Sequence, residues 1–280
     1  MIKKHRKKYR AVWLVLLLSL CVMAISGFKL SETMQVYQIG EESYAELADM
    51  VRPAGIPVFY AAQEKPAGAS KEPAKQESPA LAERETGTGA KIELPEMDID
   101  FGALQEVNPS GQAWLYCPGT AIDYPVMRAI DYDYYLHHLP NGARNANGSL
   151  FIDYNNAPDF SDGLTVIYGH NMKSGQMFGS LTEYKKQAYF AKHPYMYLYT
   201  PGGNCRIDLM YGCVIGAGEW RERAFMYEVN LNSLLAYAAQ NTTFSSETRY
   251  AEGDRVVALS TCSYEFNDAR YVVIGVLRPE

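Results

Sequence analysis

The sequence predicts a mainly β domain with added helices, folded as a barrel or a sandwich within residues 94–280. Along this region about eight runs rich in Val, Ile and Tyr alternate with turn signals, as consecutive strands do. With 48% hydrophobic and 12% aromatic residues, the chain has enough apolar side chains to bury a large core. No internal repeat is visible in the sequence.

Two helical segments interrupt the expected strands. Leu and Ala at helical spacing predict an amphipathic helix over residues 230–240, with Asn230 as its N-cap. A second helix is expected within residues 177–192. Before the strands, DFGALQEVNPS predicts a short helix that Asn108-Pro109 ends. The strands are expected at residues 113–120, 121–127, 149–156, 164–170, 195–200, 205–217, 255–265 and 270–277.

The N-terminus carries the pattern of a membrane anchor. Residues 1–10, MIKKHRKKYR, contain six Lys and Arg and no acidic residue, and residues 11–28 are uncharged. Eighteen residues span about 27 Å as a helix, near the lower limit for crossing a bilayer. The positive-inside rule predicts a cytoplasmic basic segment, a single-pass anchor over 11–28 and an extracellular remainder. A cleaved signal peptide is the alternative, because Ala24-Ile25-Ser26 is a small-x-small site; either way the body is exported.

A flexible linker is predicted between the anchor and the β domain. Residues 29–60 are expected to be a partly helical juxtamembrane region, and residues 61–93 to be the linker. Residues 61–90 contain no aromatic or β-branched apolar side chain, so they cannot bury enough surface to offset the entropy of ordering. The β domain is expected to begin near Leu94 and to fold without the linker. Because the linker separates the N-terminal helix from the domain, the sequence leaves open whether that helix packs on it.

Charge and cysteine content exclude several functions. The net charge is −6, and residues 11–280 carry 20 basic against 32 acidic residues, which argues against a nucleic-acid partner. Of the five cysteines, Cys21 lies in the anchor, Cys213 is expected in the core and Cys117 at a strand end. The sequence has no CxxC pair and no Cys/His cluster with zinc spacing. No metal or cofactor is expected.

One cysteine near the C-terminus has a setting that suggests chemistry. Cys262 lies in LSTCSYEFNDAR, at the end of an expected strand, and Arg270 opens the next strand. A hairpin of this length brings the guanidinium back toward the thiol, where it can donate two hydrogen bonds to a developing oxyanion. Taken separately, a packing cysteine and an exposed arginine at a strand start are ordinary structural features.

A thiol becomes an effective nucleophile when a base or a cation lies nearby, and His170 is the best candidate for that partner. It ends an expected strand and opens a Gly-rich loop in VIYGHNMKSGQMFGSL. The other four histidines lie in the basic segment, at a helix end or after a Tyr-rich stretch. The sequence therefore predicts a site that combines His170, Cys262 and Arg270.

The segments around these residues resemble one family. LSTCSYEFNDARYVVIGVL looks like the active-site segment of sortases, and of class B sortases in particular. YGHNMKSGQMFGSL is similar to the histidine segment of that family, VNPSGQAWLYCPGTAIDYPVM to its first strands and GSLFIDYNN to a further block. The resemblance covers roughly residues 98–280, and the helical insert at 230–240 is typical of class B. One position departs from the pattern, because class B members often carry a basic residue where this chain has Asn155.

This resemblance implies an eight-stranded sortase barrel with an N-terminal helix and a helix inserted before the last strands. It implies a cysteine transpeptidase, tethered to a Gram-positive-type cell membrane, that cleaves a C-terminal sorting motif (NPxTN-like or xPxTG-like) after its Thr. Cys262 would attack the Thr carbonyl, His170 would act as general acid and base, and Arg270 would hold the substrate and stabilise the oxyanion. The implied partners are sorting-signal peptides of exported proteins and an acceptor amine of a peptidoglycan precursor or a pilin. Candidates for substrate binding are Thr261, Ser263, Tyr264 and Glu265.

Two other functions fit the same residues. A secreted cysteine protease would form the same thioacyl intermediate and release it with water, and an amine-dependent product distinguishes transfer from hydrolysis. A non-catalytic, wall-associated binding module would use a surface rich in the chain's 22 tyrosines. Its cysteine would be inert, so a thiol-reactive reagent would not label it.

Overall fold

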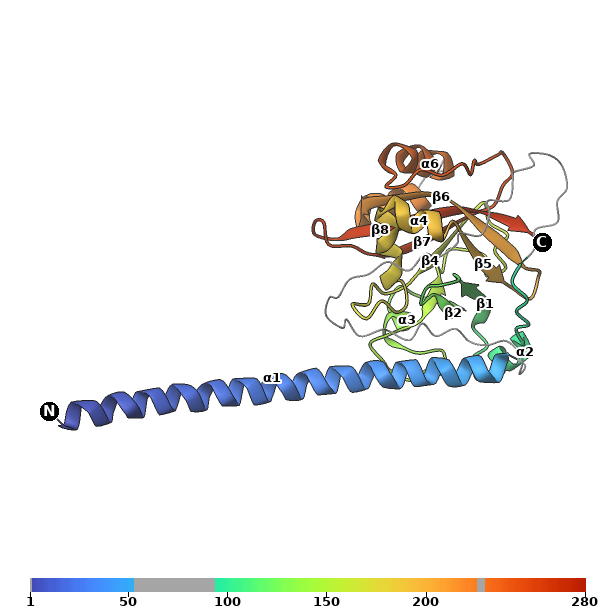
Figure 1. Cartoon of the computed structure of the whole chain (residues 1–280). Helices are drawn as coiled ribbons and strands as arrows, with labels where there is room; N and C mark the ends of the chain where they lie inside the picture. Colours follow the sequence, from blue (N-terminus) through green and yellow to red (C-terminus); the bar gives the residue numbers. More distant parts are fainter. Residues whose placement is uncertain (1, 53–93, 226–229) are drawn as a thin grey trace, which may run out of the picture.

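The computed structural model describes residues 2–52, 94–225 and 230–280 (Figure 1). Eight strands form one closed barrel in the order β1-β2-β3-β4-β7-β8-β6-β5, which confirms the barrel implied by the sequence. A long helix, α1 (Ile2–Val51), runs past the barrel, and its N-terminal part extends well beyond it (Figure 1). The linker predicted at residues 61–93 lies outside the described residues.

The strands agree with the eight expected runs, although β3 is shorter than its run. Their bounds are β1 (Gly111–Tyr116), β2 (Asp123–Arg128), β3 (Leu150–Ile152), β4 (Leu164–Tyr168), β5 (Tyr195–Tyr199), β6 (Cys205–Gly216), β7 (Val256–Cys262) and β8 (Ala269–Pro279). The remaining elements are α2 (Phe101–Val107), α3 (Tyr134–His137), the 3-10 helix η1 (Gly179–Lys185), α4 (Gln187–Lys192), α5 (Ala217–Phe225) and α6 (Asn230–Asn241).

The helices agree with the sequence in part. The short helix expected before Asn108 is α2, the helix expected at 230–240 is α6, and the one expected within 177–192 divides into η1 and α4. Nothing in the sequence pattern predicts α5, because AGEWRERAF is largely polar and follows β6 directly without a turn signal. This unexpected helix covers part of the site described below.

Two apolar layers lie on opposite sides of the β7–β8 hairpin. Successive side chains of a strand point to opposite faces, so each strand contributes to both layers. One layer fills the barrel, and the other lies between the barrel and helices α5 and α6. The inner series comprises Val257, Leu259, Tyr271 and Val273, and the outer series comprises Val256, Ala258, Val272 and Ile274.

Strand β6 changes the face that its side chains cover midway along its length. A bulge between Leu209 and Tyr211 shifts its register against β8. Before the bulge, Ile207 and Leu209 belong to the barrel core, and after it Cys213 and Ile215 pack in the outer layer with α5 and α6. The expected core position of Cys213 is confirmed, since the residue is fully buried.

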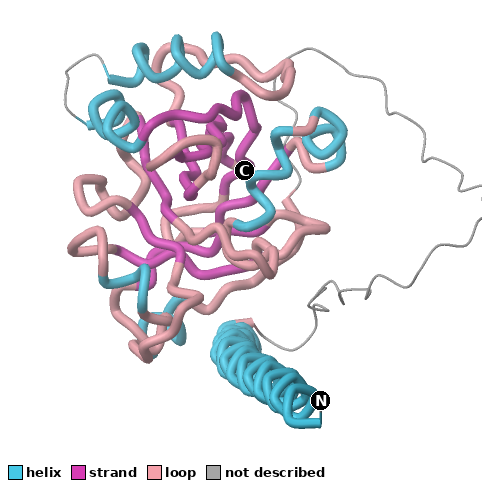
Figure 2. The backbone as a smooth tube through the Cα atoms, turned by 90° about the vertical axis from the view of Figure 1, so that its left-hand side faces the viewer, coloured by secondary structure: helices cyan, strands magenta, loops and turns pink. Residues whose placement is uncertain are grey.

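The C-terminal part of α1 packs on the barrel, a contact that the sequence leaves open. Figure 2 looks nearly along α1 and shows it lying beside the barrel. Tyr44, Leu47, Ala48 and Val51 are buried and follow the spacing of one helix face. The Tyr44 hydroxyl also donates to the Gly148 carbonyl oxygen at 2.6 Å. This apolar stripe is the physical reason for the contact.

A buried ion pair closes the same contact at the end of α1. The Arg52 guanidinium makes two hydrogen bonds to the Asp123 carboxylate, one of them 2.9 Å long. The Trp114 indole N–H donates to the same carboxylate at 2.6 Å, and the Arg52 guanidinium lies 4.5 Å from the Trp114 ring centre. Because removing one partner would leave an uncompensated buried charge, this group holds the helix end firmly on β1 and β2.

Upstream of this contact α1 is exposed. Within the described part of the chain, one helical stretch, Leu16–Val51, is long and apolar enough by length and composition to cross a membrane. This stretch overlaps the anchor predicted at residues 11–28. The helix continues without interruption from there to Val51, so residues 29–51 of the juxtamembrane region are helical, while residues 53–60 lie outside the described residues.

Truncation of Leu47 to Ala should destabilise the full chain, because this side chain is 5% exposed within the contact between α1 and the barrel. Removing a buried Leu side chain typically costs about 2–5 kcal/mol. Thermal melting in detergent micelles should therefore move clearly downward. Met50→Ala is the matched control, since Met50 lies on the same helix and is 58% exposed. Equal melting temperatures for the two variants would contradict a stabilising role for α1.

Candidate active site

Strands β7 and β8 bring the candidate nucleophile and the candidate cation together. They pair antiparallel in a register that sets Cys262 opposite Arg270. Directly opposed residues of an antiparallel pair project from the same face of the sheet. This is the hairpin geometry that the eight-residue spacing in the sequence predicts.

The candidate base comes from the strand on the other side of β7. Strand β4 pairs in parallel with β7, with Tyr168 opposite Ser260. The chain continues in the same direction past the last pair, and the Gly169 N–H donates to the Ser260 carbonyl oxygen at 3.2 Å. His170 and Cys262 therefore follow two residues beyond the same pair. Two strands far apart in sequence thus bring the imidazole and the thiol to one end of the barrel.

Gly169 is required for this arrangement. A Cβ atom at this position would collide with the side chains of Leu150 and Phe178. The Gly169 carbonyl oxygen also accepts a hydrogen bond from the Thr261 hydroxyl at 2.7 Å. This hydrogen bond joins Gly169, the residue before His170, to Thr261, the residue before Cys262.

A cavity of about 160 Å³ opens on the outer face of the barrel beside α5. His170, Cys262 and Arg270, the three residues predicted to be catalytic, all line it. Cys262 continues the outward-facing series of β7 that begins with Val256 and Ala258, which is why its side chain lies outside the barrel core. The other lining residues are Tyr132, Leu136, Phe151, Tyr168, Gly169, Ala217, Trp220, Arg221, Ser260 and Thr261.

One hydrogen bond sets the orientation of the His170 ring. Its Nε2 lies 2.7 Å from the carbonyl oxygen of Leu136, at the end of the barrel covered by α3. A carbonyl oxygen only accepts, so Nε2 carries a proton and donates it. The Nδ1 atom is then the ring nitrogen that remains to exchange a proton with a thiol or a leaving amine.

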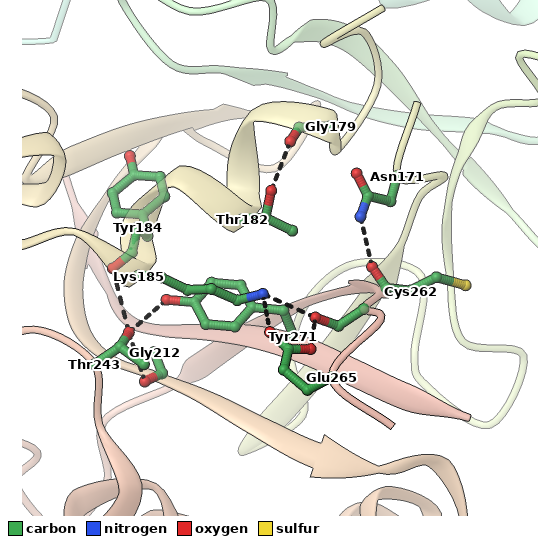
Figure 3. Close-up of polar contacts among 11 residues, drawn as sticks. Asn171, Gly179, Thr182, Tyr184, Lys185, Gly212, Thr243, Cys262, Glu265 and Tyr271 are labelled. Atoms are coloured by element: carbon green, nitrogen blue, oxygen red, sulfur yellow. Dashed lines mark hydrogen bonds and ion pairs between the residues drawn. The ribbon is translucent and has the colours of Figure 1, made fainter. Parts of the chain in front are cut away.

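The cysteine backbone is held by the residue after the histidine. The Asn171 side-chain amide donates to the Cys262 carbonyl oxygen at 2.8 Å (Figure 3). The Cys262 side chain is partly exposed. In Figure 3 its sulfur points away from this contact. The Arg270 guanidinium donates to the Ala269 carbonyl oxygen at 3.0 Å.

A polar group that the sequence reasoning missed forms one wall of the cavity. Asp153 is buried, and its carboxylate accepts hydrogen bonds from the Tyr168 hydroxyl at 2.8 Å and from the Asn155 side-chain amide at 2.9 Å. Asn155 also donates to the Tyr132 hydroxyl at 3.3 Å. Burial first, and then the Asp153 carboxylate, raise the pKa of both Tyr132 and Tyr168. Both phenols therefore stay protonated at neutral pH and serve as donors.

Helix α5 supplies residues that no sequence signal indicates. Trp220 and Arg221 line the cavity, and the Arg221 guanidinium lies 5.7 Å from the centre of the Tyr132 ring. The cavity therefore carries a second guanidinium beside that of Arg270. The positions of Trp220 and Arg221 depend on the packing of α5 against β6 and β8. The polar sequence of that helix does not indicate this packing.

The four residues predicted to bind substrate lie in different settings. Thr261 lines the cavity. Ser263 and Glu265 instead contact Lys185, and Tyr264 is 75% exposed. Their role in substrate binding stays a prediction.

The remaining cysteines differ chemically from Cys262. All five cysteines are free, and Cys117, Cys205 and Cys213 are buried. Burial raises the pKa of each of these three thiols, to about 12 for Cys213. Among the described residues, no group of three or more His, Cys, Asp or Glu side chains is arranged to hold a metal ion.

The sortase domain model matches residues 115–278 of this chain. The sequence is 34% identical to sortase B of Listeria monocytogenes over 179 residues, which cover 62% of this chain and 72% of that protein. The chain is a class B sortase. It is therefore a cysteine transpeptidase, a member of a family of cell-surface enzymes.

Solved structures agree with this assignment. The sortase B of Clostridium perfringens is 29% identical, with a TM-score of 0.58, and the match covers 63% of this chain and 98% of that one. The sortase B of Bacillus anthracis is also 29% identical, with a TM-score of 0.57 and coverage of 66% and 84%. The family expected from the Cys–Arg and His segments is thus confirmed.

Selective alkylation should single out the cysteine of this class B sortase that lines the cavity. In a Cys21→Ser background at pH 7.5, iodoacetamide should add one label per folded chain. Cys262 is the expected site, because the other three thiols are buried and have raised pKa values. Intact mass spectrometry followed by peptide mapping measures this. The Cys262→Ala variant is the control and should stay unlabelled; rapid labelling of that variant would contradict the assignment.

Proposed function

We propose that this class B sortase cleaves a C-terminal sorting motif after its Thr and transfers the protein to an amine at the cell surface. The observation that carries the proposal is the presence of His170, Cys262 and Arg270 on one cavity in a chain of the sortase family. The motif is NPxTN-like or xPxTG-like. The acceptor is an amine of a peptidoglycan precursor or of a pilin.

The first half-reaction forms a thioacyl enzyme. The Cys262 thiol passes its proton to His170 as its sulfur attacks the Thr carbonyl carbon, and the electrons of the carbonyl group move onto its oxygen. When the tetrahedral intermediate collapses, the peptide C–N bond breaks and the leaving amine takes that proton from His170. The second half-reaction reverses this order: an acceptor amine attacks the thioester, His170 removes a proton from the amine, and the proton returns to the Cys262 sulfur as the S–C bond breaks.

Arg270 has the chemistry needed to stabilise the oxyanion. Its guanidinium is permanently charged and presents two donors in a fixed plane. The register opposite Cys262 supports this role, because it brings the donors to the strand that carries the attacking sulfur. Substrate binding by Thr261, Ser263, Tyr264 and Glu265 remains part of the proposal.

The proposal places the enzyme in the cell membrane with its N-terminus in the cytoplasm. In it, residues 1–10 are the basic cytoplasmic segment, residues 11–28 the anchor and residues 94–280 the extracellular catalytic domain; the spacer predicted at residues 61–93 lies outside the described residues. The long apolar stretch of α1 and the basic decapeptide support this topology.

Cys262→Ala should abolish formation of an acyl enzyme with a sorting peptide, as measured by intact mass. His170→Ala should keep the fold and reduce turnover by at least about 10²-fold, the usual effect of losing acid–base catalysis. Circular dichroism provides the folding control. An acyl enzyme in the cysteine variant, or full turnover in the histidine variant, would refute the site. Product that forms equally fast with and without an added amine would indicate hydrolysis rather than transfer.

Arg270→Lys separates the role of charge from that of geometry. Lysine keeps the positive charge and loses the planar pair of donors. Turnover should fall by about 10²–10³-fold, which corresponds to roughly 2.7–4 kcal/mol for one lost oxyanion donor. The melting temperature should change little, because the guanidinium donates its hydrogen bond to the carbonyl oxygen of its own neighbour, Ala269. Near wild-type turnover would mean that Arg270 is a structural or solvated charge.

A further inference from the structure

Two side chains hold the chain directly after the Cys262 Cα atom, one at the Cys262 carbonyl group and one at the side chain of Ser263 (Figure 3). Asn171 donates to the carbonyl oxygen of Cys262 itself. The Lys185 ammonium donates to the hydroxyl of the next residue, Ser263, at 2.9 Å. The same ammonium pairs with the Glu265 carboxylate, and the Ser263 hydroxyl donates to that carboxylate as well. These contacts form a closed group of three side chains, here called the Lys185 cluster.

The donors of these bonds belong to the segment that follows the histidine. Asn171 comes directly after His170, and Lys185 is the last residue of η1. The loop that they hold, residues 263–268, has exposed side chains: Tyr264 is 75% exposed and Phe266 is 51% exposed. At its base the Ser263 N–H donates to the Ala269 carbonyl oxygen at 2.9 Å. Exposed loops move more than the strands they join. The cluster therefore adds a side-chain connection between this exposed loop and the segment that carries the imidazole.

A buried ring directs the Lys185 ammonium toward this loop. The ammonium lies 5.1 Å from the centre of the Tyr271 ring. The Tyr271 hydroxyl is in turn 2.6 Å from the Thr243 hydroxyl, which also hydrogen-bonds to the carbonyl oxygens of Tyr184 and Gly212. Because Tyr271 is fully buried, its ring is a fixed support for the lysine side chain.

The charges of the cluster persist at neutral pH. Partial burial alone would raise the pKa of Glu265, but hydrogen bonds from Lys185 and Ser263 lower it to about 2. The carboxylate is thus ionised whenever the enzyme works near neutrality. The side chains of Lys185 and Glu265 are 30% and 39% exposed, and ion pairs this exposed contribute little to stability. The main effect of the Lys185–Glu265 ion pair is therefore on the position of the loop that it holds.

We propose that Lys185 is a positioning residue for transpeptidation, acting through Ser263 to hold the base of the β7–β8 loop and, with it, the Cys262 sulfur. This inference rests on the proposed function. Lys185 contacts neither Cys262 nor, in this proposal, the substrate. It sets the distance and angle at which the sulfur meets the Thr carbonyl carbon and the His170 imidazole.

The expected effect on rate follows from the geometry of acylation. The new S–C bond forms from an attacking sulfur close to the carbonyl carbon, and the proton must pass from His170 to the leaving amine in the same complex. A displacement of about 1 Å can lower the rate of such a step by about 10²-fold. Loss of the cluster should therefore reduce the rate constant of acylation by a larger factor than it changes the affinity for the peptide, to which Ser263 and Glu265 contribute in the proposed function.

The test compares Lys185→Met with Lys185→Arg in the full chain, in detergent micelles. Lys185→Met should lower kcat for a sorting peptide by about 10–100-fold, and KM should change by a smaller factor. Lys185→Arg keeps a charged donor and should recover most of the lost rate. Lys186→Met is the matched control, because Lys186 is the next residue, is 67% exposed and pairs with Glu183. It should behave like the wild type.

A second measurement does not depend on a sorting peptide. The rate of Cys262 alkylation by iodoacetamide is followed against pH in the Cys21→Ser background, with and without Lys185→Met. A displaced thiol meets a different electrostatic environment, so its pH profile should shift. Glu265→Gln provides an independent variant, since it removes the ion pair with minimal change in shape; it should also shift the profile, even if Lys185→Met does not fold.

These measurements separate failure of this inference from failure of the proposed function. If the wild type acylates no sorting peptide, the proposed function is wrong and the alkylation profiles alone decide the role of Lys185. If the wild type acylates and the Lys185→Met and Glu265→Gln variants keep kcat and the alkylation profile, the inference is wrong. A lower melting temperature with unchanged kcat and profile would also overturn it, because it would show a structural role only.

Discussion

The position of β7 between β4 and β8 is the constraint on which the active site depends. Six of its seven residues are buried, with apolar layers on both faces. A shift by one residue would send every side chain of the strand to the opposite face, so burial on both sides locks the register. Because the register is locked, Cys262 lies opposite Arg270 and beside the end of β4. The core thus determines where the chemistry takes place.

The two faces of the hairpin serve different purposes. The inner face holds the barrel together, while the outer face carries Cys262 and Arg270 at its open end, beside α5. Loop and helix residues complete the cavity on this outer side, and the polar group around Asp153 closes one wall. The reacting groups are therefore built on rigid strands, and the parts that surround a substrate are built on helices and loops.

The N-terminal helix belongs to the same structure. Its last turns bury Tyr44 and Val51 against the barrel, and the Arg52–Asp123 pair closes the contact. In the proposed function the same helix crosses the membrane, so the catalytic domain is joined to its anchor by a packed helix as well as by the chain that follows. Periodicity predicts a helix near Tyr44, but the composition of residues 61–93 leaves open whether that helix packs on the barrel. The contact joins the helix to residues far along the sequence, such as Asp123 and Gly148, so no local pattern predicts it.

The sequence by itself determined the strands, the membrane-like N-terminus and the pairing of Cys262 with Arg270. These features are local: alternation marks a strand, and a short loop makes its two flanking strands neighbours. The family resemblance of the Cys and His segments added the fold and the activity. Tertiary structure decided the rest, including the place of α5, the Asp153 wall and the contact of Lys185 with the cysteine loop. Those contacts join residues distant in sequence, and their side chains meet only after the barrel has closed.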